Sequence, residues 1–228
     1  MSWKQTTLGE IVNLKRGFDL PASKRIEGPY PIYSSSGQTG THSEAAVNGP
    51  CVITGRYGTI GQVFFSDKSC WPLNTSLYST DFKGNNPRFV YYLLKTIPWQ
   101  EYTTASAVPG INRNHVHLCP VCVPDYRTQT AIASVLGALD EQIVVNTKLN
   151  GYLLELLKAS AKNLYAEYER NEELELPVGW RWIEVDEISE MVCRGITPKY
   201  NQNSDETVLG QTCVRNNLVL LENGRLHS

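Results

Sequence analysis

Residues 127–168 read RTQTAIASVLGALDEQIVVNTKLNGYLLELLKASAKNLYAEY, and this stretch decides the architecture. It contains no proline and only two glycines, Gly137 and Gly151. Its apolar residues recur at alternating spacings of four and three, which is typical of a helix that packs against another helix. A helix of this length, roughly 60 Å at about 1.5 Å per residue, cannot bury its own apolar stripe. We therefore expect a partner helix.

The predicted helix–helix interface has a defined seam. It consists of Ile132, Leu136, Leu139, Ile143, Asn146, Asn150, Leu153, Leu157 and Leu164. A buried asparagine weakens a coiled coil but fixes its register, because the amide requires a polar partner. The alternative is a helical hairpin that breaks near Gly151 and packs within one domain, although a single glycine costs a helix only about 1 kcal/mol.

The chain before this helix is predicted to be a globular α+β domain with a mixed, short-stranded sheet. Glycine and proline separate short apolar runs that are typical of strands. We expect strands near residues 32–33, 51–54, 62–65, 77–80 and 116–123, and helices near residues 7–14 and 87–95. The second helix begins with Pro87, where a missing N–H costs nothing.

Charge divides the chain, although the formal net charge is only −2 and 41% of the residues are hydrophobic. Residues 1–127 contain 12 Lys and Arg against 8 Asp and Glu, whereas residues 128–228 contain 9 against 15. This split favours an anionic partner for the first part and a protein partner for the second. Two ordinary solvated surfaces would be the alternative.

The six cysteines are scattered, and the sequence begins without an apolar signal segment, which together favour a reducing cytoplasm. No apolar run approaches the ~18 residues of a membrane helix, so no membrane partner is expected. Cys119 and Cys122 form a lone CxxC without the further ligands that zinc requires. His115 and His117 fall in the expected strand 116–123 or directly before it, so we predict no metal site.

Residues 3–11 (WKQTTLGEI) match residues 180–188 (WRWIEVDEI) at an offset of 177, and Arg16-Gly17 matches Arg194-Gly195 after a slip of one residue. If the match is not chance, the chain starts a second copy of its first domain. We therefore expect a first recognition domain at 1–127, a long helix at 128–170, and a linker with an incomplete second domain at 171–228. A linker is expected around LPVG, residues 176–179.

A series of short motifs has a specific order along the chain. It runs LGEI (8–11), PIYSSSG (31–37), GRYGTIG (55–61), WPLNT (71–75), YYLL (91–94) and PGINR (109–113), followed by the seam and by RGITPKY (194–200). Over residues 1–168 this order resembles the specificity subunit of type I restriction–modification systems. No single motif is specific by itself.

The resemblance implies two target recognition domains separated by two antiparallel helices, with each domain reading half of a split DNA target. It also implies modification subunits that supply S-adenosylmethionine and adenine methylation, and restriction subunits that supply ATP- and Mg-dependent cleavage. This chain would bind none of those cofactors and would not be an enzyme. Because it carries one domain and one helix, the second helix would come from a second copy or from another specificity fragment.

Two other functions compete with this hypothesis. The first is a truncated coiled-coil interaction protein that binds methyltransferase subunits without DNA specificity. The second is an independent nuclease or methyltransferase. Against an amino-methyltransferase, the sequence has no Asn-Pro-Pro-aromatic or Asp-Pro-Pro-aromatic tetrapeptide, since residues 86–89 read NPRF. No serine, cysteine or histidine set has the local signatures of a nucleophilic site.

The residues expected to contact DNA lie in polar, glycine-rich segments, where Arg, Gln and Asn suit base edges and Ser, Thr and Lys suit phosphate. They are Lys24, Arg25, Ser35, Ser36, Gln38, Thr41, His42, Arg56, Tyr57, Thr59, Asn74 and Arg113. The alternatives are a flexible turn at 34–42, a tight hairpin at 55–61 with Arg56 paired to a carboxylate, and cap residues at 74 and 112–114. Lys83 and Arg88 are further phosphate candidates, and Asp140 and Glu141 are expected on the exposed helix face.

Overall fold

The computed structural model describes residues 3–103, 109–170, 175–190, 206–209, 213–215, 218–219 and 225–227. Internal contacts divide the chain into two units, Met1–Lys158 and Ala159–Ser228, and each is described by itself. Within the described ranges, no helix is both long enough and apolar enough to span a bilayer.

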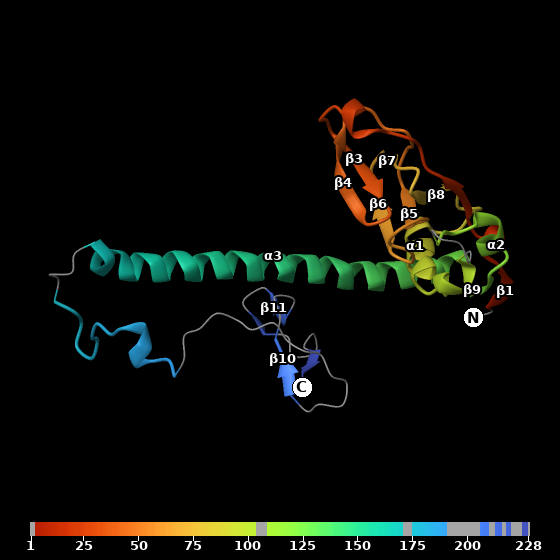
Figure 1. The fold of residues 1–228 in the computed structure, drawn as a ribbon. Coiled ribbons are helices and arrows are strands. Elements are labelled where there is room, and N and C mark those ends of the chain that lie inside the picture. The colour runs from red at the N-terminus through yellow and green to blue at the C-terminus, as the bar shows by residue number, and fades with distance from the viewer. Residues whose placement is uncertain are drawn as a thin grey trace. The chain divides into compact units, whose positions relative to one another are not determined.

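One uninterrupted helix, α3, extends from Tyr126 to Arg170 (Figure 1). It does not break at Gly151, around which there is open space. The predicted rod over residues 127–168 is therefore confirmed, and the hairpin alternative is wrong. A run of good helix formers on both sides of Gly151 outweighs the small propensity cost of one glycine.

A four-stranded antiparallel sheet forms the centre of the first domain, in the order β2-β8-β5-β6. The strands are β2 (Asn13–Arg16), β5 (Cys51–Gly55), β6 (Val63–Ser66) and β8 (Ser76–Asp81). All five residues of β5 are buried, as expected for an apolar run without alternation in a central strand. Helix α1 (Pro87–Lys95) contacts β5 and β6, and its start is capped by the Asn86 side chain.

Two smaller sheets complete the domain and make the fold mixed. β3 (Tyr30–Ser34) pairs antiparallel with β4 (Gly37–His42) and parallel with β7 (Trp71–Pro72). β1 (Lys4–Thr7) pairs antiparallel with β9 (Pro120–Val123), directly before α3. In Figure 1, β1, β9, α1 and α2 (Arg113–His117) lie at the start of α3, whereas β3, β4 and β7 lie at the other end of the domain.

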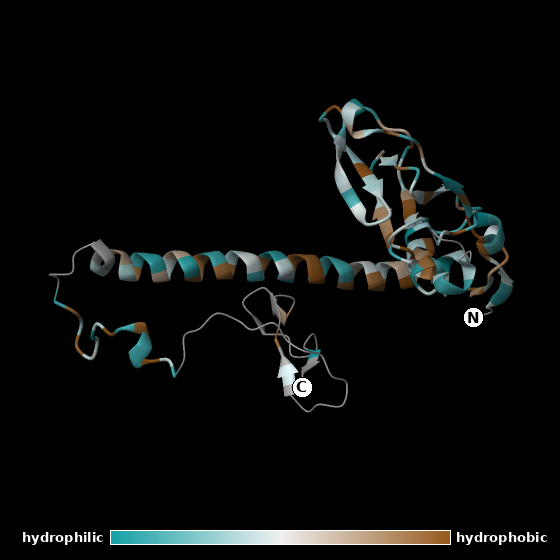
Figure 2. Ribbon diagram, viewed as in Figure 1, coloured by the Kyte–Doolittle hydropathy of each residue, from teal (hydrophilic) through white to brown (hydrophobic). Residues whose placement is uncertain are grey.

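The main hydrophobic core lies between the central sheet and α1, and it extends to the start of α3. Val52, Leu77 and Leu94 are among its fully buried members. Ala133 of α3 belongs to the same core, and Ile132 packs against it. Figure 2 shows these apolar strands and also apolar segments that recur along α3 beyond the domain.

Most expected elements are confirmed, but the helix predicted at residues 7–14 is wrong. Only Leu8–Glu10 form a 3-10 turn, η1, between strands β1 and β2. Residues before the turn pair with β9 and residues after it pair with β8. The sheet partners supply backbone hydrogen bonds that override the local helical spacing.

Two further segments differ from the expectation. The strand expected at 116–123 begins only at Pro120, because Arg113–His117 form helix α2, which Asn112 caps by accepting a hydrogen bond from the Asn114 N–H at 3.0 Å. The presumed loop at 34–42 is largely strand β4, leaving only Ser35 and Ser36 as the turn.

The second unit repeats one local feature of the first. Its 3-10 turn, η4 (Val185–Glu187), lies at the offset of 177 from η1 (Leu8–Glu10), so the sequence repeat has a structural counterpart. Trp180 packs against Tyr165 and Tyr168, with ring centroids 5.5 and 5.9 Å apart.

Short strand pairs follow in this unit. They are β10 (Glu206–Val208) with β13 (Arg225–His227), and β11 (Val214–Arg215) with β12 (Leu218–Val219). The motif at residues 194–200 and the Arg194-Gly195 match lie outside the described residues.

Candidate nucleic-acid interface

Three arginines from separate segments line one cleft in the first domain. Arg16 comes from the end of β2, Arg56 from the loop after β5, and Arg113 from the start of α2. The cleft has a volume of about 340 Å³, and Tyr57, Leu77 and residues 110–112 and 114 complete its lining. Such a concentration of guanidinium groups suits an anionic ligand, because each group presents a planar fork of donors to phosphate or to a guanine edge.

Backbone hydrogen bonds hold the cleft together. The N–H groups of Arg56 and Tyr57 both donate to the Thr75 carbonyl, at 2.9 and 3.1 Å. The Ile111 N–H donates to the Arg56 carbonyl at 2.9 Å. These bonds join three loops that are distant in the sequence, so the side chains that they carry have a defined arrangement.

Tyr57 lines the cleft next to Arg56 and packs against Gly110, in the segment that precedes Arg113. Its ring lies so close to Gly110 that any Cβ at position 110 would overlap it, which explains the glycine. The Arg56 guanidinium lies over the same ring, 4.4 Å from its centroid. This cation–π contact orients the guanidinium without neutralising its charge.

One carboxylate lies beside the cleft. Asp19 pairs with Arg16 at 3.5 Å, and it also accepts a hydrogen bond from the Asn74 side chain. Both side chains of the ion pair are more than half exposed, so the pair is weak and phosphate can compete for Arg16. Asn74 precedes Thr75, the residue that holds the arginine loop, and thereby connects the two groups.

The serine turn between β3 and β4 adjoins the arginine loop. A Cβ on Gly58 would lie 3.4 Å from the Ser35 Oγ, and one on Gly55 would lie 3.1 Å from the Ser35 carbonyl oxygen. The turn is hydrogen-bonded, since the Ser36 N–H and the Gly37 carbonyl both contact the Ser34 hydroxyl at 3.2 Å. Hydroxyl groups therefore lie beside the arginine cleft in an ordered turn.

The structure brings together a subset of the predicted DNA-contacting residues. Arg56, Tyr57 and Arg113 line the cleft, and Ser35, Ser36, Thr59 and Asn74 lie in the turns and loops that adjoin it. Arg16 was not among the predicted residues. Its match to Arg194 in the internal repeat is the sequence signal that could have identified it.

His42 is buried, with 6% exposure, and the prediction that it contacts DNA is wrong. Its Nδ1 lies 3.1 Å from the Ile26 backbone nitrogen, and its ring packs edge-on against Trp71. The register of the β3–β4 ribbon explains this position, because Ser34 opposite Gly37 closes the turn, whereas His42 opposite Tyr30 lies at the far end.

The other predicted residues of this ribbon and its surroundings do not reach the cleft lining. Thr41 lies opposite Pro31, next to His42, and Arg25 donates to the Leu20 carbonyl at 3.4 Å. Lys24 is exposed in the short 3-10 turn η2, Ala22–Lys24. Gln38 lines a different hollow, the groove between the domain and α3.

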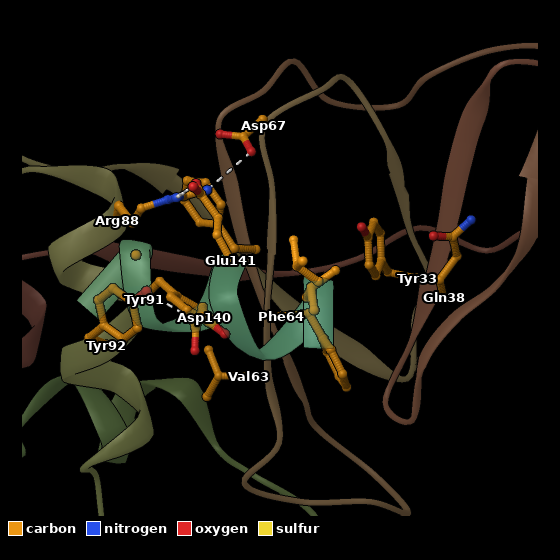
Figure 3. A pocket seen from close by; sticks show the side chains of 14 residues that line it. Tyr33, Gln38, Val63, Phe64, Asp67, Arg88, Tyr91, Tyr92, Asp140 and Glu141 are labelled. Carbon is orange, nitrogen blue, oxygen red and sulfur yellow. Dashed lines mark hydrogen bonds and ion pairs between the residues drawn. The ribbon is translucent and has the colours of Figure 1, made fainter. Parts of the chain in front are cut away.

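That groove has a volume of about 600 Å³, and α3 lines it with residues between Gly137 and Val145 (Figure 3). Arg88 and Asp67 lie at one end, and Tyr33 and Gln38 lie at the other. Arg88 pairs with Asp67 at 3.4 Å and with Glu141 of α3 at 3.5 Å. These two carboxylates compete with phosphate for the Arg88 guanidinium, and a phosphate contact by Arg88 stays a prediction.

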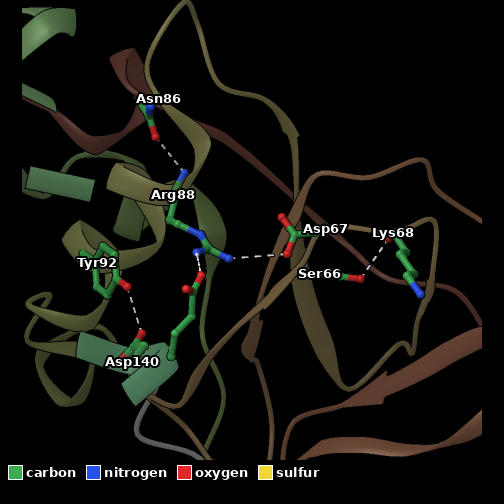
Figure 4. A network of polar contacts seen from close by, with 8 residues as sticks. Ser66, Asp67, Lys68, Asn86, Arg88, Tyr92 and Asp140 are labelled. Carbon is green, nitrogen blue, oxygen red and sulfur yellow. Dashed lines mark hydrogen bonds and ion pairs between the residues drawn. The ribbon is translucent and has the colours of Figure 1, made fainter. Parts of the chain in front are cut away.

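Asp140 also differs from the expectation of an ordinary exposed helix residue. It is half-buried, and the Tyr92 hydroxyl donates to its carboxylate at 2.8 Å (Figure 4). Burial, together with this hydrogen bond and the nearby Asp140 charge, raises the pKa of Tyr92. Sequence reasoning missed this contact because nothing in the local pattern relates positions 92 and 140.

The predicted seam divides into two parts. Ile132 and Leu136 are half-buried near the domain, whereas the apolar seam positions beyond them are exposed. The exposed ones are Leu139 (57%), Ile143 (62%), Leu153 (48%), Leu157 (67%) and Leu164 (56%). Leu139 follows the buried Gly137 by two residues, which places the two side-chain positions about 160° apart around the helix axis. The exposed part of the seam therefore faces away from the domain.

No group of three or more metal-ligating side chains occurs among the residues that the structure describes. Cys119 is buried and Cys122 is exposed. The His117 Nε2 accepts a hydrogen bond from the Leu14 N–H at 3.0 Å, and burial lowers the pKa of this histidine. His117 therefore serves the packing of α2 against β2.

Comparisons with known proteins agree on one family. Residues 1–154 match the family described as type I restriction modification DNA specificity domain. Over 143 residues the chain is 25% identical to the type I restriction enzyme EcoprrI specificity subunit of Escherichia coli, covering 60% of this chain and 36% of that protein. The chain thus spans only about a third of this relative.

Solved structures share the fold. The crystal structure of a type I restriction-modification system S subunit from M. genitalium aligns with a TM-score of 0.58 at 17% identity, over 99% of this chain and 68% of that one. A structure described under complex assembly and conformational transition of the type I R-M system aligns with a TM-score of 0.50 at 16% identity, over 74% of this chain and 43% of that one.

Proposed function

The chain belongs to the type I restriction modification DNA specificity family, and from this premise we propose that it reads one half of a split DNA target for partner subunits. The observation that carries the proposal is the cleft that gathers Arg16, Arg56 and Arg113 beside an ordered serine turn. A DNA reader needs phosphate contacts for position and base-edge contacts for sequence, and this surface offers groups of both kinds.

The roles follow from the chemistry of each side chain. Arg16 and Arg113 are suited to phosphates at the border of the cleft, since Arg113 is exposed and Arg16 is held only by a weak ion pair. Arg56 is oriented by the Tyr57 ring and is suited to a guanine edge. The hydroxyls of Ser35 and Ser36 can serve phosphate or base edges.

We place the chemistry of the system on other subunits. The sequence lacks the tetrapeptide that an amino-methyltransferase uses on a flipped base, which supports a chain that binds DNA without modifying it. S-adenosylmethionine would then be held by modification subunits, and ATP and Mg by restriction subunits. The complex would act in the cytoplasm, where its DNA is.

The exposed seam of α3 supports a second proposal, a homodimer or a pairing with another specificity fragment. The side chains of Leu139, Ile143 and Leu157 are 57–67% exposed, and burying them against a second helix would remove their apolar surface from water. Asn146 and Asn150 lie on the same seam and would fix the register through their amides. The pairing would place two reading domains on one rod.

The proposal is tested by co-expressing the chain with its cognate modification subunits and sequencing the modified adenines in the host DNA. We expect methylation at one recurrent sequence. Methylation at no defined sequence, with the protein complex intact, would favour the competing interaction protein without DNA specificity. A matched variant, Arg56→Gln with Arg113→Gln, should abolish or alter the recurrent sequence without changing the composition of the complex.

A further inference from the structure

We infer that Tyr92 and Arg88, through their carboxylate partners on α3, fix the angle between the reading domain and the rod and so set the separation of the DNA half-sites. The inference rests on the proposed function, because separation has a meaning only for a protein that reads two half-sites. It assigns these two side chains a positioning role outside the arginine cleft.

The rod has a first attachment close to its start. Gln129 is 3% exposed, and its amide donates to the Asn85 side-chain oxygen at 2.8 Å and to the Pro124 carbonyl at 3.0 Å. Its side-chain oxygen accepts a hydrogen bond from the Asn86 N–H at 3.0 Å. All the polar groups of one buried side chain are thus used to hold α3 at this position.

A second attachment lies three helical turns further on. The Tyr92 hydroxyl donates to Asp140 at 2.8 Å, and Arg88 bridges Asp67 at 3.4 Å and Glu141 at 3.5 Å (Figure 4). Gly137 allows this approach, because a Cβ there would lie only 3.1 Å from Nη1 of Arg88. Arg88 is itself oriented by the Phe65 ring, 5.2 Å away.

Two attachments fix a direction, whereas one allows a pivot. Gln129 and Asp140 are eleven residues apart, which corresponds to roughly 17 Å along the helix axis. Beyond Asp140, every residue from 141 to 158 is exposed. Within this unit, the second attachment is therefore the last place where the domain controls the direction of the rod.

The neighbouring groove provides space for such a pivot. It has a volume of about 600 Å³, and its lining includes Tyr33 and Phe64 of the sheets and Val144 and Val145 of α3. Figure 3 shows Tyr33 and Phe64 in this groove. Val144 and Val145 are 52% and 57% exposed, so closing the groove would bury apolar surface. The second attachment ties α3 to α1 at one end of the groove, so a pivot of the rod has to strain the Tyr92–Asp140 hydrogen bond and the Arg88–Glu141 ion pair.

A small change in the angle between the domain and the rod moves the far end of the rod by a distance comparable to one base step of DNA. The rod extends roughly 44 Å from Gln129 to Lys158, so a pivot of about 5° moves its end by roughly 4 Å. One base step along a strand is about 3.4 Å. A selective spacing therefore requires an angle that is fixed within a few degrees.

The test uses the full chain with its modification subunits and a DNA library in which two randomised blocks are separated by spacers of different lengths. We expect the wild type to select one spacer length, and the double variant Tyr92→Phe, Arg88→Gln to select at least one additional length with unchanged half-site sequences. The control is Glu155→Gln, which removes an ion pair with Lys158 on the same helix outside both attachments. The control should retain the wild-type spacing.

The same single spacer length in the double variant and the wild type would overturn the inference and leave the proposed function intact. A wild type that selects no sequence at all would instead contradict the proposed function.

A measurement without DNA tests whether these contacts fix the angle, whatever sequence the complex selects. Spin labels at Glu44→Cys and Lys148→Cys, with Cys122→Ser and Cys193→Ser, report the distance between the domain and the rod. The double variant should broaden or shift the distance distribution relative to Glu155→Gln. An unchanged, narrow distribution in a folded double variant would overturn the inference even if the complex selects a single half-site.

Discussion

Two parts of helix α3 share one apolar spacing but differ in what covers their apolar residues. In the root of α3, residues 126–141, small residues such as Ala133 and Gly137 are buried against the domain. In the free length, residues 142–158, every residue is exposed, including Leu149, Leu153 and Leu157. The repeat spacing predicts a helix in both parts, but only the root has its neighbours within the unit.

This difference indicates a division of work along the rod. The root fixes the domain that carries the arginine cleft, and the free length presents a wide apolar stripe on the side that faces away from Gly137. Substitutions that remove contacts between the root and the domain should therefore affect stability and direction, whereas substitutions of exposed seam residues, including Leu139 at the end of the root, should affect association. The following predictions test that division from the largest expected effect to the smallest.

Charged substitutions on the seam should have the largest effect. Each leucine that leaves water contributes roughly 1.5–3 kcal/mol, so Leu139→Asp with Leu153→Asp should remove most of the association energy of a dimer. Sedimentation velocity should give the mass of one chain for the variant and of two chains for the wild type. If a demonstrated dimer retained its mass with both aspartates present, the seam would not be its interface.

Alanine substitutions of two glutamines of α3, one in the root and one in the free length, compare the two regions directly. Gln129→Ala removes three hydrogen bonds from a buried side chain, leaves their buried or half-buried partners unsatisfied, and should lower the free energy of unfolding by about 2–3 kcal/mol. The exposed Gln142 side chain donates one hydrogen bond to the Asn146 side chain at 3.0 Å. Gln142→Ala should therefore change the free energy of unfolding by less than about 0.5 kcal/mol. Urea denaturation measures both values. Equal losses for the two variants would contradict the division.

The arginine cleft should affect DNA affinity alone. Arg113→Gln removes one phosphate contact, so binding should weaken by roughly the same factor for every sequence, and the slope of log affinity against log salt should fall by about 1. Fluorescence anisotropy at several salt concentrations checks this. The control Lys148→Gln lies on the free length, and its salt slope should match that of the wild type. Equal slopes for Arg113→Gln and wild type would remove Arg113 from the interface.

His117 should produce the smallest effect, a pH dependence confined to the domain. Burial lowers its pKa in the folded state, so below about pH 6.5 the unfolded chain takes up a proton more readily and stability falls as the pH falls. His117→Gln should reduce the difference in unfolding free energy between about pH 7 and about pH 5. An identical difference in the variant would show that another group is responsible.

The fold was largely predictable because its signals are local. The spacing of apolar residues defines α3, Pro87 marks the start of α1, and apolar runs mark β5 and β6. The failure at residues 7–14 has a non-local cause, since the strands on either side of Leu8–Glu10 are held by partners far along the chain.

The candidate site was predicted less completely for the same reason. Arg56, Tyr57 and Arg113 were found from residue type, but the cleft that unites them depends on backbone hydrogen bonds that the Thr75 carbonyl accepts and the Ile111 N–H donates. His42 has a suitable side chain for DNA, yet the ribbon register buries it. Arg88 has a charge that suits phosphate, but the sequence does not show that Asp67 and Glu141, from other elements, lie beside it and compete for its guanidinium.

Native mass spectrometry of the complete complex with its selected DNA tests the division of work most directly, because one spectrum reports both the protein subunits and the bound duplex. The reading variant, Arg56→Gln with Arg113→Gln, should retain every protein subunit and lose the duplex. The rod variant, Leu139→Asp with Leu153→Asp, should lose the second copy of the chain. A reading variant that retains the duplex at wild-type occupancy, or a rod variant with both copies, would contradict the account.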